Sequence, residues 1–478
     1  MTVSGTLRST PSSSSTHHES VDDRIARGKR ARELVPRRRH GEWAPGPGRP
    51  EALSILEGQE RTRVPDLVPI RHGRMAASAF AYYRGAAAVM ASDLGSEPRT
   101  GLDVQLCGDA HLVNFGGFAA PDRTLVFDVN DFDETLPGPF EWDVKRLAAS
   151  LEIAARDREM RRSLRQEVAA AGARAYRLAI REFAGMRMLD VWYSRLDVAA
   201  MKSRWGGEAS QTTVENMQRL ASKAESKDQI KAFDKLTQVD DGVVRFVSDP
   251  PLLVPVSELA AGIEVDFIED TVGKALRSYR KTLAGDRRHL LDNYRFVDLA
   301  RKVVGVGSVG TRCWVALLLG RDEHDPLFIQ IKEAEGSVLE PHLKKSEYAN
   351  HGQRVVEGQR LMQAASDILL GWDNVQGLDG ETRDYYMRQL WDWKASADIA
   401  TMPPENLSLY AQICGWTLAR AHARSGDAIA IGAYLGTGDV FDRSIVDFAG
   451  AYAEQNDLDH RQLVDAIHSG KVQATTGV

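Results

Sequence analysis

The pattern of apolar and polar positions divides the chain into a helical first part, a strand-rich middle and a helical end. Apolar residues recur with a helical period between Met75 and Leu94, which predicts one long helix there. Residues 143–235 are rich in Ala, Arg, Glu and Leu with few helix breakers, so they are also expected to be mostly helical. Residues 300–335 are rich in Gly and Val and predict strands. The pattern further predicts a helix at about Glu347–Leu370, a strand at Tyr385–Trp393 and helices from Asn406 onwards.

Two short apolar strands lead into polar motifs. Val104–Cys107 runs into the segment Gly108–Asn114 (GDAHLVN), and Thr124–Phe127 runs into the acidic run Asp128–Glu134. A third segment, Asp240–Pro255, predicts a hairpin or a loop that ends in prolines. Loops that leave strands often carry functional side chains, so the two motifs are the first candidates for chemistry.

Both motifs contain side chains that phosphate transfer requires. Asp109 and Asn114 could supply a carboxylate that accepts a hydroxyl proton and an oxygen ligand for magnesium. The acidic run offers four further carboxylates, those of Asp128, Asp131, Asp133 and Glu134. Simpler interpretations are a plain turn at Gly108, a solvated acidic loop or a calcium loop. The calcium loop is disfavoured because the sequence lacks regularly spaced ligands with a closing Glu.

A glycine motif lies about two hundred residues further on. Gly305, Gly307 and Gly310 match G-x-G-x-x-G, with Ser308 between them. In a dinucleotide-binding fold this motif opens a helix, and Glu333 or Glu335 would then bind the ribose. In a kinase it is the turn of a hairpin that covers the ATP phosphates. The residues after Gly310 suit a strand at first, although their end would also tolerate a helix.

Lys332 ends the short apolar strand Phe328–Lys332, like the V-A-I-K segment of kinases. Its ammonium could pair with ATP phosphates while a Glu on the next helix holds it. Glu357 is the first choice for that Glu, and Glu340 and Glu347 are alternatives. The simpler interpretation is an exposed lysine at a strand end beside a tight glycine turn.

The segment Gly108–Asn114 resembles the GD-x-H-x-x-N catalytic loop of the aminoglycoside phosphotransferase and choline kinase group of the protein kinase-like superfamily. The resemblance implies that Asp109 is the catalytic base and Asn114 a metal ligand. His111 lies inside the same loop and is expected to support its packing, with direct chemistry as the alternative.

In that group a metal-binding Asp follows on a strand, then a Gly-Pro turn, then an Asp that begins a helix. Asp131, Gly138-Pro139 and Asp143 fit this order. Asp131 is therefore the favoured metal ligand, Asp128 and Asp133 remain candidates, and Asp143 is expected to support the catalytic loop.

The order of these motifs is reversed relative to ordinary kinases, in which the glycine loop and lysine precede the catalytic loop. The sequence therefore predicts an α+β, kinase-like two-lobe fold that is circularly permuted. The expected segments are a disordered tail (1–22), a basic arm and linker (23–60), a helical catalytic lobe (61–295), a strand-rich ATP-covering lobe (296–395) and C-terminal helices that complete the helical lobe (396–478).

A closer resemblance covers nearly the whole chain after about residue 22. The runs LVPIRHGRM, YYRGAA, GDAHLVNFG, FDVNDFDETLPGPFEWDVKRLAAS and LARAHARSGD resemble a bacterial family of unassigned function, domain-of-unknown-function family 2252. This resemblance implies a link to the kinase-like superfamily and brings no known substrate.

Composition narrows the classes of function. The chain has 478 residues, 43% of them hydrophobic and 27% charged, with a net charge of −6, so nucleic-acid binding by the whole chain is not expected. No apolar run approaches the ~18 residues of a membrane span, and a cytoplasmic location is expected. Cys107, Cys313 and Cys414 lie far apart and are expected to be buried thiols. Arg24–His40 holds eight Lys or Arg residues and is expected to be a solvated helix or an arm that reaches phosphates or an acidic partner.

The sequence thus predicts a phosphotransferase that uses ATP and Mg²⁺ and acts on an unidentified hydroxyl-bearing substrate, with its oligomeric state left open. A nucleotide-binding pseudokinase and a nucleotidyl transferase on the same fold are the alternatives. The residues of secondary interest are Lys29, Arg84, Gly85, Arg420, His422 and Arg424, which could bind an anion or only complete a helix face, and Trp391–Trp393, which could form an adenine-binding hinge.

Overall fold

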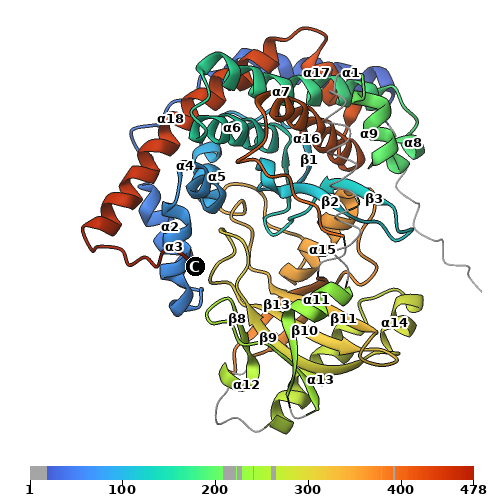
Figure 1. The fold of residues 1–478 in the computed structure, drawn as a ribbon. Coiled ribbons are helices and arrows are strands. Elements are labelled where there is room, and N and C mark those ends of the chain that lie inside the picture. Colours follow the sequence, from blue (N-terminus) through green and yellow to red (C-terminus); the bar gives the residue numbers. More distant parts are fainter. Residues whose placement is uncertain are drawn as a thin grey trace, which may run out of the picture.

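The computed structural model describes residues 19–207, 222, 229–240, 242–259, 265–377, 379–390 and 393–478, with only the backbone at 265–269. The protein has a mixed α+β architecture, as predicted. Helices gather in one region, which we call the helical part, and a six-stranded antiparallel sheet forms another, which we call the sheet part (Figure 1). Chain segments from before and after the sheet part build the helical part together.

The helical part is centred on α6, which is buried along almost its whole length from Glu141 to Ala155. Helices α7 and α16 pack closely beside it. A Cβ atom on Gly415 of α16 would lie 2.3 Å from Gly172 O of α7, so only glycine permits this approach. The elements of this part are α1 (Val21–Leu34), η1 (Arg37–Gly41), α2 (Ala52–Glu60), η2 (Pro65–Leu67), α3 (Val68–Ala76), α4 (Ala79–Gly85), α5 (Ala87–Gly95), η3 (Leu112–Asn114), α6 (Glu141–Asp157), α7 (Arg162–Ala184), α8 (Met188–Tyr193), α9 (Val198–Trp205), α16 (Pro404–Ser425), α17 (Ala428–Leu435) and α18 (Val440–His468).

The single helix predicted at Met75–Leu94 is wrong, because the chain breaks it twice. Ser78 caps α4 by accepting the N–H of Ala81, and Ala86 leaves helical geometry before α5 begins. The breaks divide the segment into three short helices, α3 to α5, of which α3 packs against α4 and α5 packs against α2. They thereby bring the end of α4 next to the glycine motif, since a Cβ on Gly307 would lie 3.1 Å from Arg84 O.

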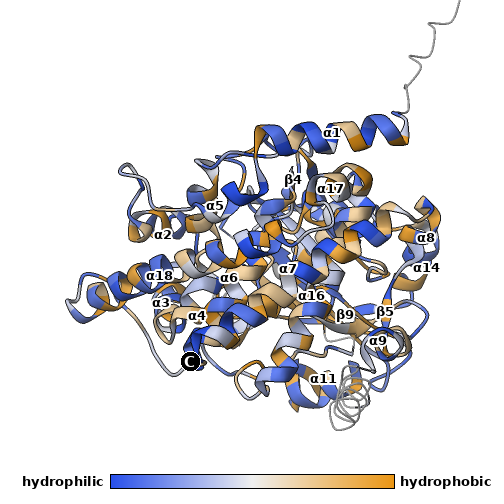
Figure 2. Cartoon of the chain, turned by 90° about the horizontal axis from the view of Figure 1, so that it is seen from above, coloured by the Kyte–Doolittle hydropathy of each residue, from blue (hydrophilic) through white to orange (hydrophobic). Residues whose placement is uncertain are grey.

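The basic segment folds as α1 and η1, of which α1 docks on α17 (Figure 2) and η1 contacts α18. Arg24 forms an ion pair of 2.7 Å with Asp427, and Arg27 also contacts this carboxylate. Arg32 and Arg37 donate to carbonyl groups at the C-terminal end of α17. Four of the eight basic side chains of the segment therefore bind α17 or its N-cap residue, Asp427. Of the tail predicted to be disordered, residues 1–18 lie outside the described part of the chain, and α1 begins at Val21.

The sheet part has the strand order β12-β13-β11-β10-β9-β8, with every neighbour antiparallel. Alternate residues of β10 enter two different cores: Val315 and Leu317 face α11 and β7, whereas Ala316 and Leu318 face α13 and α14. Both faces of β10 are covered, which explains why its sequence is continuously apolar. The elements are α11 (Gln229–Leu236), β6 (Thr237–Asp240), β7 (Val243–Phe246), β8 (Leu253–Pro255), α12 (Val256–Leu259), α13 (Val265–Arg280), α14 (Gly285–Leu291), β9 (Arg295–Lys302), β10 (Cys313–Leu319), β11 (Pro326–Glu333), α15 (His351–Met362), β12 (Gly371–Gln376) and β13 (Thr382–Gln389).

Several predicted elements are confirmed with shifted bounds. The hairpin at 240–255 is β6 and β7, the helix at 347–370 is the shorter α15, and the strand at 385–393 is β13. The sheet part begins at α11, earlier than residue 296, because α11, α13 and α14 cover its faces. Three small pairings lie in the helical part and carry the first two motifs: β1 (Asp103–Leu106) with β4 (Leu136–Pro139), β2 (Phe115–Ala119) with β3 (Leu125–Val129), and β3 with β5 (Leu196–Asp197).

Helix α15 lies between the helical part and the sheet part (Figure 1). Its contacts reach the sheet at β12 and β13 and the helical part at α16 and β1. Among the helices described, none is both long enough and apolar enough to cross a membrane.

Candidate active site between the helical and sheet parts

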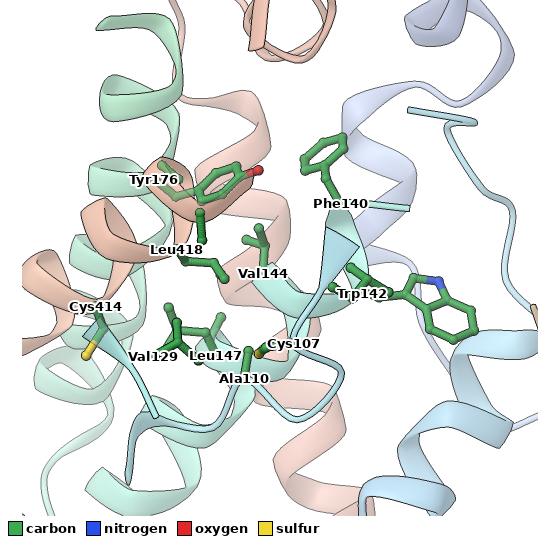
Figure 3. Packing of buried hydrophobic residues seen from close by; sticks show 14 of the residues in the cluster. Cys107, Ala110, Val129, Phe140, Trp142, Val144, Leu147, Tyr176, Cys414 and Leu418 are labelled. Atoms are coloured by element: carbon green, nitrogen blue, oxygen red, sulfur yellow. The ribbon is translucent and has the colours of Figure 1, made fainter. Parts of the chain in front are cut away.

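The apolar core of the helical part fixes the loop that follows β1. Cys107 and Ala110 point into the apolar cluster beneath the loop, together with Val129 of β3 and Leu147 of α6 (Figure 3). Gly108 has φ +82°, and a Cβ there would lie 2.3 Å from Glu134 O, so this turn requires glycine. The core thus holds the apolar residues of the loop and leaves its polar residues facing the sheet part.

Asp143 supports this loop, as the resemblance implies. Its carboxylate accepts the N–H of Cys107 at 2.8 Å and of Gly108 at 3.1 Å. His422 Nε2 lies 3.2 Å from the same carboxylate, and Tyr176 Oη lies 2.9 Å from His422 Nδ1. A buried chain of polar groups from α6, α16 and α7 therefore sets the backbone just before Asp109.

Arg146 binds one carboxylate oxygen of Asp109, and the other oxygen is not bound by Arg146 in this way. Asp109 also lines a cavity. Arg146 of α6 donates to Oδ1 from Nε at 2.8 Å and from a terminal nitrogen at 2.7 Å. His111 Nε2 lies 3.8 Å from Oδ2, beyond hydrogen-bond distance. Burial lowers the pKa of His111 to about 4, so its ring is neutral at pH 7. Arg146 was not singled out from the sequence, although it follows Asp143 by three residues and therefore shares its face of the helix.

Asn114 is held beside both loops. Its side-chain amide donates to the backbone carbonyl of Asp109 at 2.7 Å, and its own backbone carbonyl accepts the N–H of Asn130 at 2.8 Å. The first contact fixes the amide nitrogen within the loop, and Asn114 lines both of the cavities that Asp131 lines.

The four acids of the second motif separate into different roles. Asp128 is buried and pairs with Arg420 of α16, and it also accepts the N–H of Ala364 at 2.9 Å. Its oxygens therefore face protein donors and are poorly placed for a metal. Asp131 and Asp133 face the cavities instead. Glu134 accepts the N–H of Val338 at 2.7 Å, and burial raises its pKa to about 7.

Lys332 of β11 joins the two motif regions. It is buried, and its ammonium contacts Asp133 and lies 3.9 Å from Asp131 Oδ2. Burial would lower the pKa of Lys332, but these two carboxylates raise it well above the ordinary value. Tyr386, which is paired with Lys332 across the sheet, donates to Asp133 at 2.7 Å. Partial burial and then the charge of Asp133 raise the pKa of Asp131, whereas Lys332 outweighs burial and lowers the pKa of Asp133.

The expected pair between Lys332 and a helix Glu is absent from the described part of the chain. Glu357 lies on α15 but pairs with Arg360 at 3.2 Å, and no ion pair joins Lys332 to Glu340 or Glu347. Arg354 of α15 reaches the site instead. It donates to Thr135 O at 2.8 Å, Asp133 O at 2.8 Å and Glu335 O at 2.7 Å.

The glycine motif is the turn of an antiparallel hairpin between β9 and β10. It does not open a helix, so the dinucleotide-binding interpretation with Glu333 or Glu335 is wrong. Glu333 instead pairs with Arg312 and Arg383. The hydroxyl of Ser308 lies 3.4 Å from Asp133 Oδ2, which places the turn over the acidic loop.

The outer side of the turn is tied to the helical part. Val64 N donates to Gly310 O at 2.8 Å, Arg63 donates to Val309 O, and Arg74 donates to Gly305 O. Val309 is fully buried with Leu67 and Ile70. The first helices of the chain therefore hold the glycine turn in place.

Two adjoining cavities of about 370 Å³ and 140 Å³ lie between these groups. The larger extends from the Gly108–Asn114 loop to the end of β13, and its size is in the range of small-molecule sites. The smaller contains Asp109, His111, Asp133 and Gly307. The residues that line both cavities are Arg84, Asn114, Asp131, Gly305 and Ser308.

The residues present fit a magnesium ion only in part. Within the described ranges, no three His, Cys, Asp or Glu side chains converge on a point that could hold a metal. Asn114 and Asp131 offer oxygen atoms, which magnesium prefers, and this ion usually keeps several ligands from water or phosphate. A site of two protein ligands completed by nucleotide phosphates is compatible with this donor set.

Of the remaining sequence candidates among the described residues, Arg84 and Gly85 line these cavities and the others do not. Arg388 of β13, Lys302 and Gln330 line the larger cavity and were not singled out from the sequence. Trp391 and Asp392 lie outside the described residues, and Trp393 stacks on Arg123 at 4.3 Å. Arg424 stacks on Trp192 at 3.9 Å, so it completes a helix face. Lys29 lies on α1, which lines neither cavity.

Comparisons with known proteins give one family. A sequence model described as "Uncharacterized protein conserved in bacteria (DUF2252)" matches residues 63–466. No curated protein and no solved structure matches the chain. The match spans the Gly108–Asn114 motif, the acidic run, the glycine turn and Lys332, and the chain thus belongs to the DUF2252 family of bacterial proteins.

Proposed function

We propose that this protein is a phosphotransferase that uses ATP and magnesium and transfers phosphate to a hydroxyl group. The observation that carries the proposal is the contact of Lys332 with Asp133 and its approach to Asp131, together with Ser308 above Asp133. About two hundred residues separate these partners along the chain, so no local pattern forces them together. Kinases need this combination of catalytic loop, metal-binding acid, glycine turn and lysine.

Each residue has a role that its surroundings support. Asp109 Oδ2 accepts the proton of the acceptor hydroxyl while the acceptor oxygen bonds to the terminal phosphorus and ADP leaves. Arg146 orients Asp109 by holding Oδ1. Lys332 releases Asp133 and pairs with nucleotide phosphates, and the N–H groups of the glycine turn face those phosphates. Asn114 and Asp131 would hold the magnesium ion, which supplies neutralisation of the phosphate charge.

The order of elements in the sheet part supports a kinase-like arrangement. A glycine turn joins β9 to β10, the lysine lies on the next strand, β11, and the helix α15 follows. Under the proposal the chain is circularly permuted, since this unit follows the catalytic loop. The departure is α15, which directs Arg354 rather than a Glu to the site.

Two other functions keep the same site. A pseudokinase would bind ATP without turnover. The observation that favours it is that Asp109 and Lys332 already form ion pairs within the protein, with Arg146 and Asp133. A nucleotidyl transferase would instead transfer AMP, which carries the α-phosphate, and release pyrophosphate. Incubation with γ-labelled and α-labelled ATP separates the three, because only the γ label is transferred by a phosphotransferase.

The first test is thermal unfolding with and without millimolar ATP and magnesium. The wild-type midpoint is expected to rise, because a ligand that binds only the folded state stabilises it. Asp131→Asn should lose most of that rise, and Glu357→Gln on α15 should retain it. An unchanged wild-type midpoint would refute the nucleotide site. If ATP binds, Asp109→Asn should abolish label transfer and keep the thermal response.

A further inference from the structure

Arg84 is a charged side chain at the junction of the two cavities, and the proposed phosphate transfer gives it no role. It lies near the end of α4, is half-buried, and lines both cavities. Its guanidinium makes no hydrogen bond or ion pair within the described part of the chain, and its buried Nε has no partner. An unpaired guanidinium in a half-buried place is costly, so a partner from solution is expected.

Neighbouring cations differ from Arg84 because they already have partners. Lys332 contacts Asp133, Arg146 holds Asp109, and Arg388 donates to Asn130 O at 3.0 Å. Arg63 also has an unpaired Nε, but it donates to Val309 O. Arg84 therefore has the donor capacity to bind an added anion.

The backbone around Arg84 is fixed on both sides. Tyr83 O accepts from Arg146 at 2.8 Å, and Gly85 O accepts from Arg71 at 3.0 Å. Arg84 O itself lies under Gly307 of the glycine turn. The first contact ties α4 to the arginine that holds Asp109, so the position of Arg84 relative to Asp109 is preset.

We propose that Arg84 binds a phosphoryl group at the junction of the two cavities. The group belongs either to the nucleotide, as its terminal phosphate, or to a phosphorylated acceptor. A planar guanidinium with free N–H groups matches two oxygens of a phosphate, and the nearby Asp109 favours an arrangement in which the reacting centre lies between them. That the bound group takes part in phosphate transfer rests on the proposed function. Whether Arg84 binds an anion at all can be tested without a nucleotide.

The test compares wild type, Arg84→Gln and Arg99→Gln by calorimetry. Arg99 is a matched control because it belongs to the same N-terminal helical region, donates to Gly95 O and His342 O, and lines neither cavity. The probes are ATP with magnesium, ADP with magnesium, and inorganic phosphate with and without ADP. Since Arg84 has no partner to lose, Arg84→Gln should unfold at the wild-type temperature or slightly above it.

If Arg84 holds the terminal phosphate, Arg84→Gln should bind ATP about ten- to a hundredfold more weakly and bind ADP as wild type does. If it holds the phosphate of the acceptor, both nucleotides should bind normally and the affinity for inorganic phosphate should fall by a similar factor. Wild-type behaviour of Arg84→Gln with ATP and with phosphate would overturn the inference. Failure of wild type to bind any nucleotide would refute the proposed function, and the phosphate titration would then decide the Arg84 site alone.

Discussion

At the scale of single residues, carboxylates that look alike in the sequence have different partners in the folded site. Asp128 and Asp131 are three residues apart, yet the first is enclosed by Arg420 and backbone N–H groups, and the second faces the cavities. Asp109 and Asp143 differ in the same way, because Asp143 is saturated by the backbone N–H groups of the loop. Carboxylates whose oxygens are all bound by protein donors stabilise the structure, whereas those with an oxygen facing the cavities remain available for ligands.

Asp128→Asn should be destabilising, because it leaves Arg420 buried without its counter-charge. We expect a loss of about 3–5 kcal/mol in the free energy of unfolding, measured with urea. Asp131→Asn should change this quantity by less than about 1 kcal/mol, because it removes a charge that Asp133 opposes. Equal losses in the two variants would contradict the division between a structural and a ligand-facing acid.

His111 should make the protein sensitive to acid. Its pKa is about 4 in the folded state and 6.5 as the ordinary value, so between these pH values the unfolded chain binds the proton more readily. Stability should fall as pH decreases from 6.5 to 4, by up to about 3 kcal/mol from this residue. His111→Gln should reduce the difference between unfolding free energies measured at pH 7 and pH 4.5. An unchanged difference would show that the ring is not protected from protonation.

At the scale of elements, the sequence predicted what local periodicity encodes. It predicted the strands before both motifs, the hairpin before β8 and the helical class of α7 and α16. It missed the breaks at Ser78 and Ala86 because packing of α3 against α4 decides them. It missed Arg146 and Arg354 because their importance depends on partners from distant segments. The choice of Glu357 followed a kinase pattern, whereas the position of α15 turns Arg354 toward the acidic loop.

Arg354 should stabilise the acidic loop through three carbonyl oxygens. Arg354→Met keeps the volume of the side chain but leaves Asp133 O, Thr135 O and Glu335 O without this donor. We expect a loss of about 3 kcal/mol in unfolding free energy, because hydrogen bonds from a charged donor are among the stronger ones. Glu357→Gln on the same helix breaks only a half-exposed pair with Arg360 and should cost less than about 1 kcal/mol. Similar small losses in both variants would remove the structural role given to Arg354.

At the scale of the whole molecule, the helical part is closed by segments from both ends of the described chain. Helix α1 rests on α17, Trp43 packs against Phe448 and Tyr452 of α18, and Arg49 bridges Asp93 and Asp459. The segment predicted as an arm and linker therefore packs on the outside of the helical part and stabilises it.

Asp427 should control the docking of α1. It caps α17 by accepting the N–H of Ile429 and Ala430 and also binds Arg24 and Arg27. Asp427→Ala should lower the unfolding free energy by about 1–2 kcal/mol and speed trypsin cleavage between Arg24 and Arg32. Asp439→Asn, which removes an exposed pair with Arg443, should leave cleavage unchanged. Resistance of Asp427→Ala to trypsin in this segment would contradict the docking role.

The pairing of α7 with α16 also has a consequence for protein synthesis. More than two hundred residues separate these helices, and the whole sheet part is translated between them. The sheet part is continuous in sequence and can complete its core on the ribosome, whereas α6 and α7 emerge early with an apolar face that has no partner. We therefore expect the nascent chain to depend on chaperones until α16 has emerged, and the loop that carries Asp109 to become rigid only near the end of translation.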